Sequence, residues 1–232
     1  MLTELGGMLD STSPAASYED YVAAAVDWNA MHKHTATTRR KTLRHLRELY
    51  SLSPTVPVFA AMRAVWYAES DGKPVLAALC ATARDPVMRS TFETVVSLER
   101  CQPTTAWALS EAVSDAFPGH YGGTVIGRIG RNLASSWSQA GLLSGHSRKV
   151  RAQPVATPTN TAYALYLGHL CGAAGDTLFS TIWARMLGRP VSELRALAGL
   201  AARQGWLEYR QSGGTTELTF RHFVSLSGVH LR

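Results

Sequence analysis

The chain has 232 residues, of which 46% are hydrophobic and 17% charged, so its composition excludes an intrinsically disordered protein and favours packed globular domains. Its formal net charge of +6 favours an anionic partner, although many soluble proteins carry as much charge. No apolar run approaches the roughly 20 residues that span a bilayer, so we expect no membrane partner. The acidic start lacks the basic segment of a signal peptide, and three scattered cysteines form no disulfide framework. We therefore expect a cytoplasmic protein.

The N-terminal part of the chain is expected to be helical after a loose start. Residues 1–17 are rich in Gly, Ser and Pro, which predicts a flexible N-terminus. Residues 18–100 read as a helical domain whose helices are joined by short turns. Its helix over residues 35–52 carries a block of cations, namely Arg39, Arg40, Lys41, Arg44 and Arg47. This block is either a solvated helix face or a set of contacts to nucleic-acid phosphates.

Residues 101–153 are expected to form a first winged-helix-like unit. A helix over residues 105–117 is followed by one over residues 124–140, whose apolar face includes Ile129, Leu133 and Trp137. The opposite face carries side chains of the types that contact phosphates and base edges: Arg128, Arg131, Asn132, Ser135 and Gln139. A merely solvated face is an equally open interpretation. The basic segment that follows, residues 144–151, contains Arg148, Lys149 and Arg151 and predicts a short wing.

Residues 154–232 are expected to form a second, C-terminal winged-helix unit. After a linker and a leading helix, a helix over residues 176–187 is ended by Gly188 and Pro190, and another runs from near Ser192 to Gln204. Two β-prone runs around a Gly-Gly tip then predict a hairpin. The order helix, turn, helix, hairpin resembles a winged helix-turn-helix, in which the second helix enters a DNA major groove. A winged helix that only holds proteins together is the alternative.

The two units share a short internal sequence repeat. One helix ends in Gln-Ala-Gly-Leu-Leu at residues 139–143, and the other ends in Arg-Gln-Gly-Trp-Leu at residues 203–207. The stopping glycines are Gly141 and Gly205, which lie 64 positions apart, a plausible length for one winged-helix unit with its linker. We therefore predict a mainly α protein, with a helical N-terminal bundle followed by two winged-helix-like units that carry short β-hairpin wings.

Motifs that carry catalysis are missing from the sequence. Three glycines, Gly123, Gly127 and Gly130, lack the lysine and the preceding strand of a phosphate-binding loop, and their spacing fits a helix instead. There is no HExxH or GxSxG motif, and the basic half of the chain lacks the carboxylate pair that holds nuclease metals. We therefore expect no enzymatic activity, no cofactor and no metal.

Three stretches taken in order resemble a known family. They are TTRRKTLRHLRELY at residues 37–50, RSTFETVVSLE at residues 89–99 and TVIGRIGRNLASSWSQAGLL at residues 124–143, followed by the winged-helix region. Over residues 35–225 the chain resembles the small non-catalytic A protein (BrxA) of BREX bacteriophage-defence loci. The resemblance implies a bacterial protein that binds double-stranded DNA and works beside other defence proteins. Carried over by position, it implies DNA contacts on the 128–139 helix face and at Arg195, Arg203 and Arg210.

Two functional hypotheses follow from the sequence. The first is a non-enzymatic binder of double-stranded DNA that grips phosphates with its basic helices and wings and has a weak sequence preference. The second is a winged-helix scaffold that docks partner proteins of a defence or regulatory complex, with the aromatic residues Trp206 and Tyr209 at its contact surface. RNA binding ranks lower, because no sheet with aromatic stacking residues is predicted.

Overall fold

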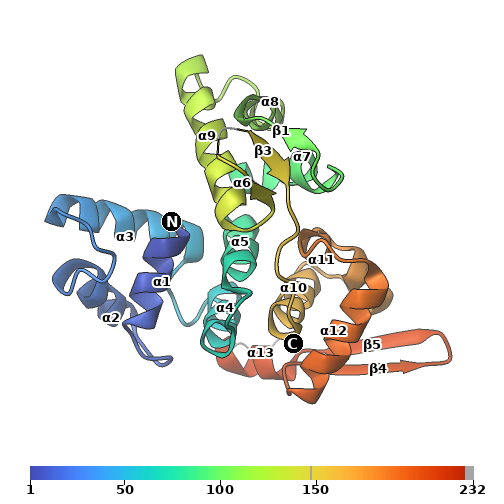
Figure 1. The fold of residues 1–232 in the computed structure, drawn as a ribbon. Helices are drawn as coiled ribbons and strands as arrows, with labels where there is room; N and C mark the ends of the chain where they lie inside the picture. The colour runs from blue at the N-terminus through green and yellow to red at the C-terminus, as the bar shows by residue number, and fades with distance from the viewer. Residues whose placement is uncertain (147, 228–232) are drawn as a thin grey trace.

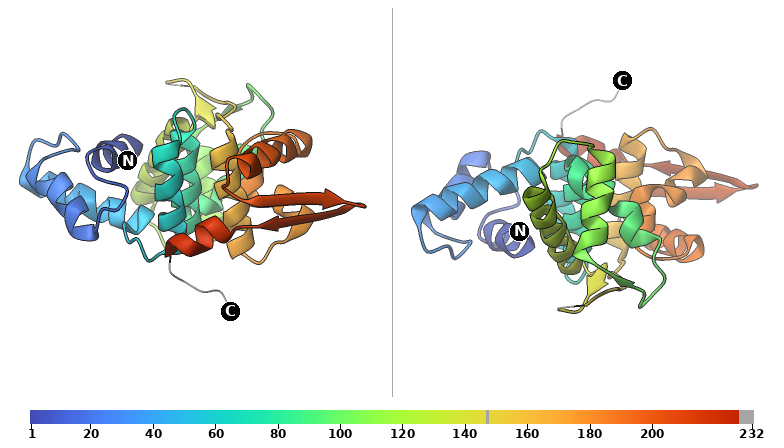
Figure 2. Two further views of the ribbon diagram at one scale, coloured as in Figure 1. Left: turned by 90° about the horizontal axis from the view of Figure 1, so that it is seen from below. Right: turned by 90° about the horizontal axis from the view of Figure 1, so that it is seen from above.

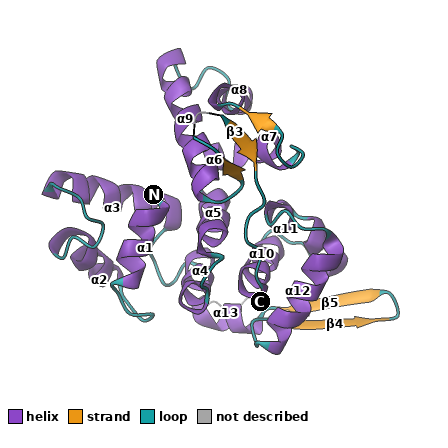
Figure 3. Cartoon of the chain, in the orientation of Figure 1, coloured by secondary structure: helices purple, strands orange, loops and turns teal. Residues whose placement is uncertain are grey.

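The computed structural model describes residues 1–146 and 148–227, and it is mainly α with small antiparallel sheets (Figure 3). The helices are α1 (Leu2–Asp10), α2 (Tyr18–Val22), the π-helix η1 (Ala23–Asp27), α3 (Ala36–Tyr50), α4 (Pro57–Ala68), α5 (Lys73–Arg84), α6 (Pro86–Ser90), α7 (Phe92–Val96), α8 (Ala106–Ala116), α9 (Gly123–Gln139), α10 (Pro158–Leu170), the 3₁₀ helix η2 (Gly175–Ser180), α11 (Ile182–Met186), α12 (Val191–Arg203) and α13 (Arg221–Ser227). The strands are β1 (Pro103–Thr104), β2 (Leu143–Ser144), β3 (Lys149–Arg151), β4 (Glu208–Ser212) and β5 (Thr215–Thr219).

Two helices without a solvent face lie at the centre of the molecule. In α5 every residue from Val75 to Thr82 is buried, and in α10 every residue from Thr159 to Gly168 is buried. The helix α5 contacts α3, α4, α6, α9, α10 and α11, and Figures 1 and 2 show it between the N-terminal helices and the later units. An apolar helix of this kind is stable only when other elements surround it. The core is therefore shared by all parts of the chain.

The expectation of a flexible N-terminus is wrong, because residues 2–10 form α1 and its Leu5, Met8 and Leu9 are completely buried. The glycines that suggested flexibility instead permit close packing, since a Cβ on Gly7 would collide with the carbonyl oxygen of Ala30.

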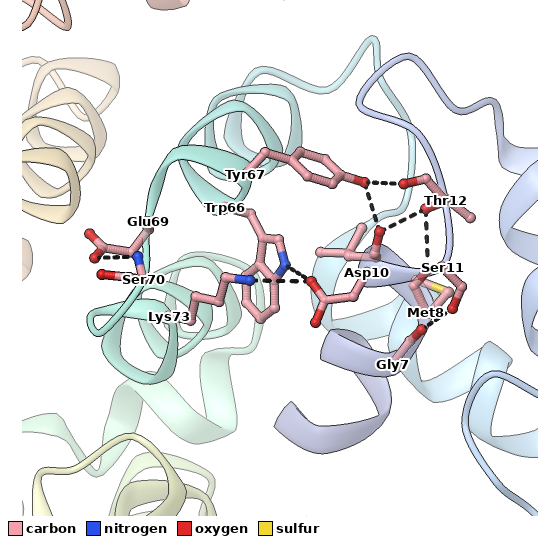
Figure 4. A network of polar contacts seen from close by, with 11 residues as sticks. Gly7, Met8, Asp10, Ser11, Thr12, Trp66, Tyr67, Glu69, Ser70 and Lys73 are labelled. Carbon is pink, nitrogen blue, oxygen red and sulfur yellow. Dashed lines mark hydrogen bonds and ion pairs between the residues drawn. The ribbon is translucent and has the colours of Figure 1, made fainter.

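Polar contacts hold the end of α1 against α4 (Figure 4). Asp10 accepts hydrogen bonds from Trp66 Nε1 at 3.0 Å and Lys73 Nζ at 3.2 Å. Tyr67 donates its hydroxyl hydrogen to the carbonyl oxygen of Leu9, with 2.8 Å between the oxygens. The first ten residues thus belong to the folded core.

The first winged-helix unit has the element order β1, α8, α9, β2, β3. Its three strands form an antiparallel sheet in the order β1-β3-β2, with Thr104 opposite Lys149 and Ser144 opposite Val150. The expected helices and strand start are confirmed, and β2 and β3 form the short wing. Ser147, in the middle of the expected wing, lies outside the described residues.

The second unit has the order α10, η2, α11, α12, β4, β5. The predicted single helix over residues 176–187 is wrong, because Thr181 is extended (φ −63°, ψ 159°) and its hydroxyl caps α11, so η2 ends before it. The helix α12 and the β4–β5 hairpin are confirmed. At the hairpin tip, Gly213 and Gly214 have φ of 57° and 82°, as a two-residue type I′ turn requires. Residues 228–232 of the predicted unit lie outside the described part of the chain.

The internal repeat in the two units includes the backbone hydrogen bonds that end the two helices. Gly141 and Gly205 have φ of 78° and 81°, and each follows the last residues of its helix in a left-handed conformation. Leu142 N donates to Trp137 O and Trp206 N donates to Ala201 O, both at 3.0 Å. This is the Schellman arrangement, in which a backbone N–H beyond the helix satisfies a carbonyl of the last turn. The two helices therefore end in the same way, with the same offset of 64 residues.

A buried carboxylate joins the N-terminal helices to the second unit. Glu69, at the end of α4, is 7% exposed and accepts hydrogen bonds from the backbone N–H groups of Ser70 and Gly72, both at 3.0 Å. The hydroxyls of Thr157 and Thr159, at the start of α10, also donate to it. Four donors thus meet one carboxylate, which offsets the cost of burying its charge.

Within the described residues, no helix combines the length and the apolar character needed to cross a bilayer.

We expect replacement of Glu69 by alanine to lower the free energy of unfolding by about 3–5 kcal/mol, because four donors, those of Gly72 and Thr159 buried, lose their acceptor. Urea denaturation followed by circular dichroism measures the change. Glu111→Ala, at an exposed position on α8, is the control and should change stability by less than about 0.5 kcal/mol. A loss for Glu69→Ala no larger than that of the control would contradict a structural role for this carboxylate.

A second carboxylate makes stability depend on pH. Burial raises the pKa of Glu4, but the hydrogen bond from Lys33 Nζ at 2.7 Å and other favourable contacts outweigh burial and lower this pKa to about 2. Because the pKa is lower in the folded than in the unfolded chain, Glu4 stabilises the fold above about pH 4.5 and loses this contribution as the pH falls towards 2. We expect Glu4→Gln to be less stable at pH 7 by about 1–3 kcal/mol and to lose less stability between pH 5 and pH 3. Urea titrations across this pH range test it, and parallel pH curves for both proteins would contradict it.

Candidate nucleic-acid interface

The helix α9 presents a polar face because its apolar face is fixed against α8. Gly130 is the closest point between them, since a Cβ there would collide with Ser110 Oγ and the carbonyl oxygen of Ala106. Leu133, Ala134 and Trp137 continue this buried face. Positions 128, 131, 132, 135 and 139 therefore point away from α8, at the spacing of one helix face.

Four of the five predicted side chains on this face are exposed and make no hydrogen bond or ion pair to other elements within the described residues. Arg128, Arg131, Asn132 and Ser135 are all exposed, and in the described part of the chain neither arginine forms an ion pair. Their two positive charges are thus available to an anion. Gln139 differs, because its side-chain oxygen accepts hydrogen bonds at 3.3 Å from the Met1 amino group and from the backbone N–H of Leu2.

A groove borders the C-terminal half of this face. It has a volume of about 710 Å³ and lies between α9 and the end of α3. Asn132, Ser135 and Gln139 line one side, and His45 and Glu48 line the other. From this groove α3 and α9 diverge, so that the basic helix faces belong to two separate arms of the molecule (Figure 1).

The predicted cations of α3 divide into exposed and structural ones. Arg40 and Lys41 are exposed, and Arg44 is exposed but lies 3.8 Å from a carboxylate oxygen of Glu48. Arg39 is half-buried, and its Nη1 donates to the carbonyl oxygen of Val26 at 2.8 Å. Fewer cations of this helix are therefore available on the surface than the sequence predicts.

The wing of the first unit also departs from the prediction at one position. Arg148 is exposed, and Lys149 is half-buried with its Nζ donating to the carbonyl oxygen of Gly145 at 2.6 Å. Arg151 was expected on the surface but is buried, because its position in β3 turns the side chain inward. Its Nη1 donates to the carbonyl oxygens of Leu142, at 3.1 Å, and Ala152, and burial lowers the pKa of its guanidinium.

In the second unit the predicted cations lie apart from one another. Arg195 packs over the ring of Phe179, and its Nη2 lies 2.9 Å from Asp176 Oδ1, so this side chain ties α12 to η2. Arg203 and Arg210 are exposed on α12 and β4. The exposed side chains of α12 are partly apolar, namely Val191, Ala196 and Leu200, and partly polar, namely Ser192, Glu193 and Arg203. This helix exposes fewer hydrogen-bonding side chains than α9.

Comparisons with known proteins add no assignment: no protein-family model matches the chain, and neither does any curated protein or solved structure.

Sequence reasoning missed a cluster of arginines away from α9. Arg100, Arg185 and Arg189 surround a pocket together with Arg151. They come from three segments separated by about 50 and 35 residues. No local pattern joins them, because only the packing of the two units brings them to one place.

Proposed function

We propose that this protein is a non-enzymatic binder of double-stranded DNA whose helix α9 enters the major groove. The observation that carries the proposal is the pair Arg128 and Arg131, exposed on the outer face of the second helix of a winged-helix-like unit and without a carboxylate partner in the described part of the chain. In helix-turn-helix proteins this helix contacts base edges with the residues of its N-terminal part. Arg128 lies in the N-terminal half of α9 and Arg131 at its middle, and neither lines the groove that α3 borders.

The remaining exposed cations serve as phosphate contacts in this proposal. Arg148 lies in the wing beside α9, and Arg40, Lys41 and Arg44 lie on α3. Lysine and arginine at such positions neutralise the DNA backbone and fix orientation without reading sequence. Asn132 is the side chain on α9 best suited to an adenine edge, so we propose that sequence preference is weak and comes mainly from this helix.

The second unit contributes little base readout in this proposal. Its outward helix face lacks amides and carries one exposed cation, Arg203. With Arg210 on the β4–β5 wing, it supplies phosphate contacts at most. The resemblance to the A protein of BREX loci supports placing this DNA-binding activity in a bacterial phage-defence system, beside other defence proteins.

We expect Arg128→Glu to weaken binding to a labelled random-sequence duplex at least about tenfold, since one such contact contributes about 1–3 kcal/mol and reversal adds repulsion. Fluorescence anisotropy at two salt concentrations measures the affinity, and the Arg128→Glu/Arg131→Glu protein should lose binding. Arg221→Glu is the matched control, because its exposed arginine lies on α13, outside the proposed interface.

Two outcomes would overturn the DNA proposal. One is the absence of duplex binding at low salt by a folded protein, and the other is an equal loss in the Arg221→Glu control. The protein-docking scaffold then becomes the favoured function. The exposed apolar side chains Val191 and Leu200 of α12 are the observation that favours it.

The α3 cations allow a separate test of backbone binding. We expect Arg40→Gln/Lys41→Gln to weaken binding equally for all duplex sequences and to reduce the slope of log affinity against log salt by about two. Asn132→Ala should instead change the ratio of affinities between duplexes while leaving the slope unchanged. Salt titrations of both variants measure this, and an unaltered slope for the α3 variant would identify this helix face as merely solvated.

A further inference from the structure

A pocket rich in arginine lies between the two winged-helix units. Its volume is about 410 Å³, at the small end of the range for small-molecule sites. The segment after α7, the segment after β3 and the turn between α11 and α12 form its walls. In Figure 1 these elements lie on the opposite side of α5 from α3, so the pocket is separate from the groove beside α9.

Four guanidinium groups line this pocket, from Arg100, Arg151, Arg185 and Arg189, and its lining contains no carboxylate. Carboxylates nearby pair with only two of them. Glu93 binds Arg185 through two hydrogen bonds of 2.6 and 2.8 Å, and Glu193 lies 3.4 Å from Arg189 Nη1.

The other two arginines, Arg100 and Arg151, lack a carboxylate partner among the described residues. The pocket therefore holds about two uncompensated positive charges.

Arg151 is the most informative of the four. It is only 7% exposed, and a buried charge is costly unless an opposite charge or several hydrogen bonds compensate it. Its Nη1 donates to carbonyl oxygens, whereas its Nη2 has no hydrogen-bond acceptor among the described residues and lies beside Gly188, where a Cβ would be 3.4 Å away. Gly188 has a φ of 64°, so a glycine is favoured at this wall of the pocket.

We infer that this pocket binds a ligand through a dianionic phosphate group, such as a phosphate monoester or a diphosphate. Two uncompensated guanidinium groups match the charge of a terminal phosphate, which is about −1.5 to −2 at neutral pH. Arginine binds phosphate oxygens through its planar fork of donors, and the half-enclosed position strengthens such hydrogen bonds. Arg100 and Arg151 bind the phosphate, while Glu93 and Glu193 hold Arg185 and Arg189 in place. The site does not depend on DNA binding by α9.

Equilibrium dialysis with radiolabelled pyrophosphate tests the site in the full-length protein. We expect saturable binding of one pyrophosphate per chain, weakened at least tenfold in Arg100→Gln/Arg189→Gln, which corresponds to about 1.4 kcal/mol. Both substitutions are outside the core and keep the buried Arg151, and circular dichroism verifies the fold. Arg221→Gln and Arg128→Gln/Arg131→Gln are the controls, and both should bind pyrophosphate as the unmodified protein does.

Two duplexes, with a 5′-phosphate or a 5′-hydroxyl, distinguish the sources of the phosphate group. Tighter binding of the phosphorylated duplex, lost in Arg100→Gln/Arg189→Gln, identifies the end of a nucleic acid as the ligand. Equal binding of both duplexes, together with pyrophosphate binding lost in this variant, identifies a free small molecule. The inference is overturned if pyrophosphate binding is not saturable, or if it is equally strong in the pocket variant.

Discussion

The burial of α5 on all sides is the constraint on which the rest of this structure depends. Ala77, Ala78 and Ala81 allow neighbouring helices to come close, and Cys80 is so enclosed that burial raises its thiol pKa to about 12. A helix without a solvent face must be covered by others, so α3, α9 and α10 are held in fixed positions around it. The arm that carries Arg40 and the arm that carries Arg128 are therefore oriented by the same core.

Two of the polar junctions between the second unit and the rest differ in physical character. At Glu69 the junction is buried and satisfied by hydrogen bonds, so it fixes the start of α10 against α4. At Glu93 and Arg185 the junction is exposed, with Arg185 also 5.2 Å from the ring centre of Phe92. Exposed ion pairs contribute little stability, typically 0–1 kcal/mol. The first junction thus stabilises the fold, whereas the second positions the guanidinium of Arg185 beside the arginine pocket.

Local chemistry made much of the fold predictable from the sequence. Glycines correctly predicted where elements end, because left-handed backbone favours glycine. The examples are Gly188, Gly205 and the Gly-Gly tip of the hairpin. The polar face of α9 was likewise predictable from helical periodicity. What failed depended on tertiary contacts: Gly7 indicated flexibility but permits close packing, and Arg151 looked like a wing contact but points inward. The arginine pocket had no sequence signal, because its members are brought together only by the packing of two units.

The two winged-helix units share a backbone plan but not a surface. Both second helices end in the same hydrogen-bonded glycine motif, yet α9 exposes two arginines and an asparagine, whereas α12 exposes one arginine, a glutamate and the apolar Val191 and Leu200. Since function depends on side chains placed on a fold and not on the fold itself, the repeat need not bind the same ligand twice. Arg195 shows the divergence most clearly, because on α12 it packs over Phe179 and pairs with Asp176. A cation of the second unit's helix is therefore used in internal packing, whereas Arg128 and Arg131 of the first unit's helix are exposed to solvent.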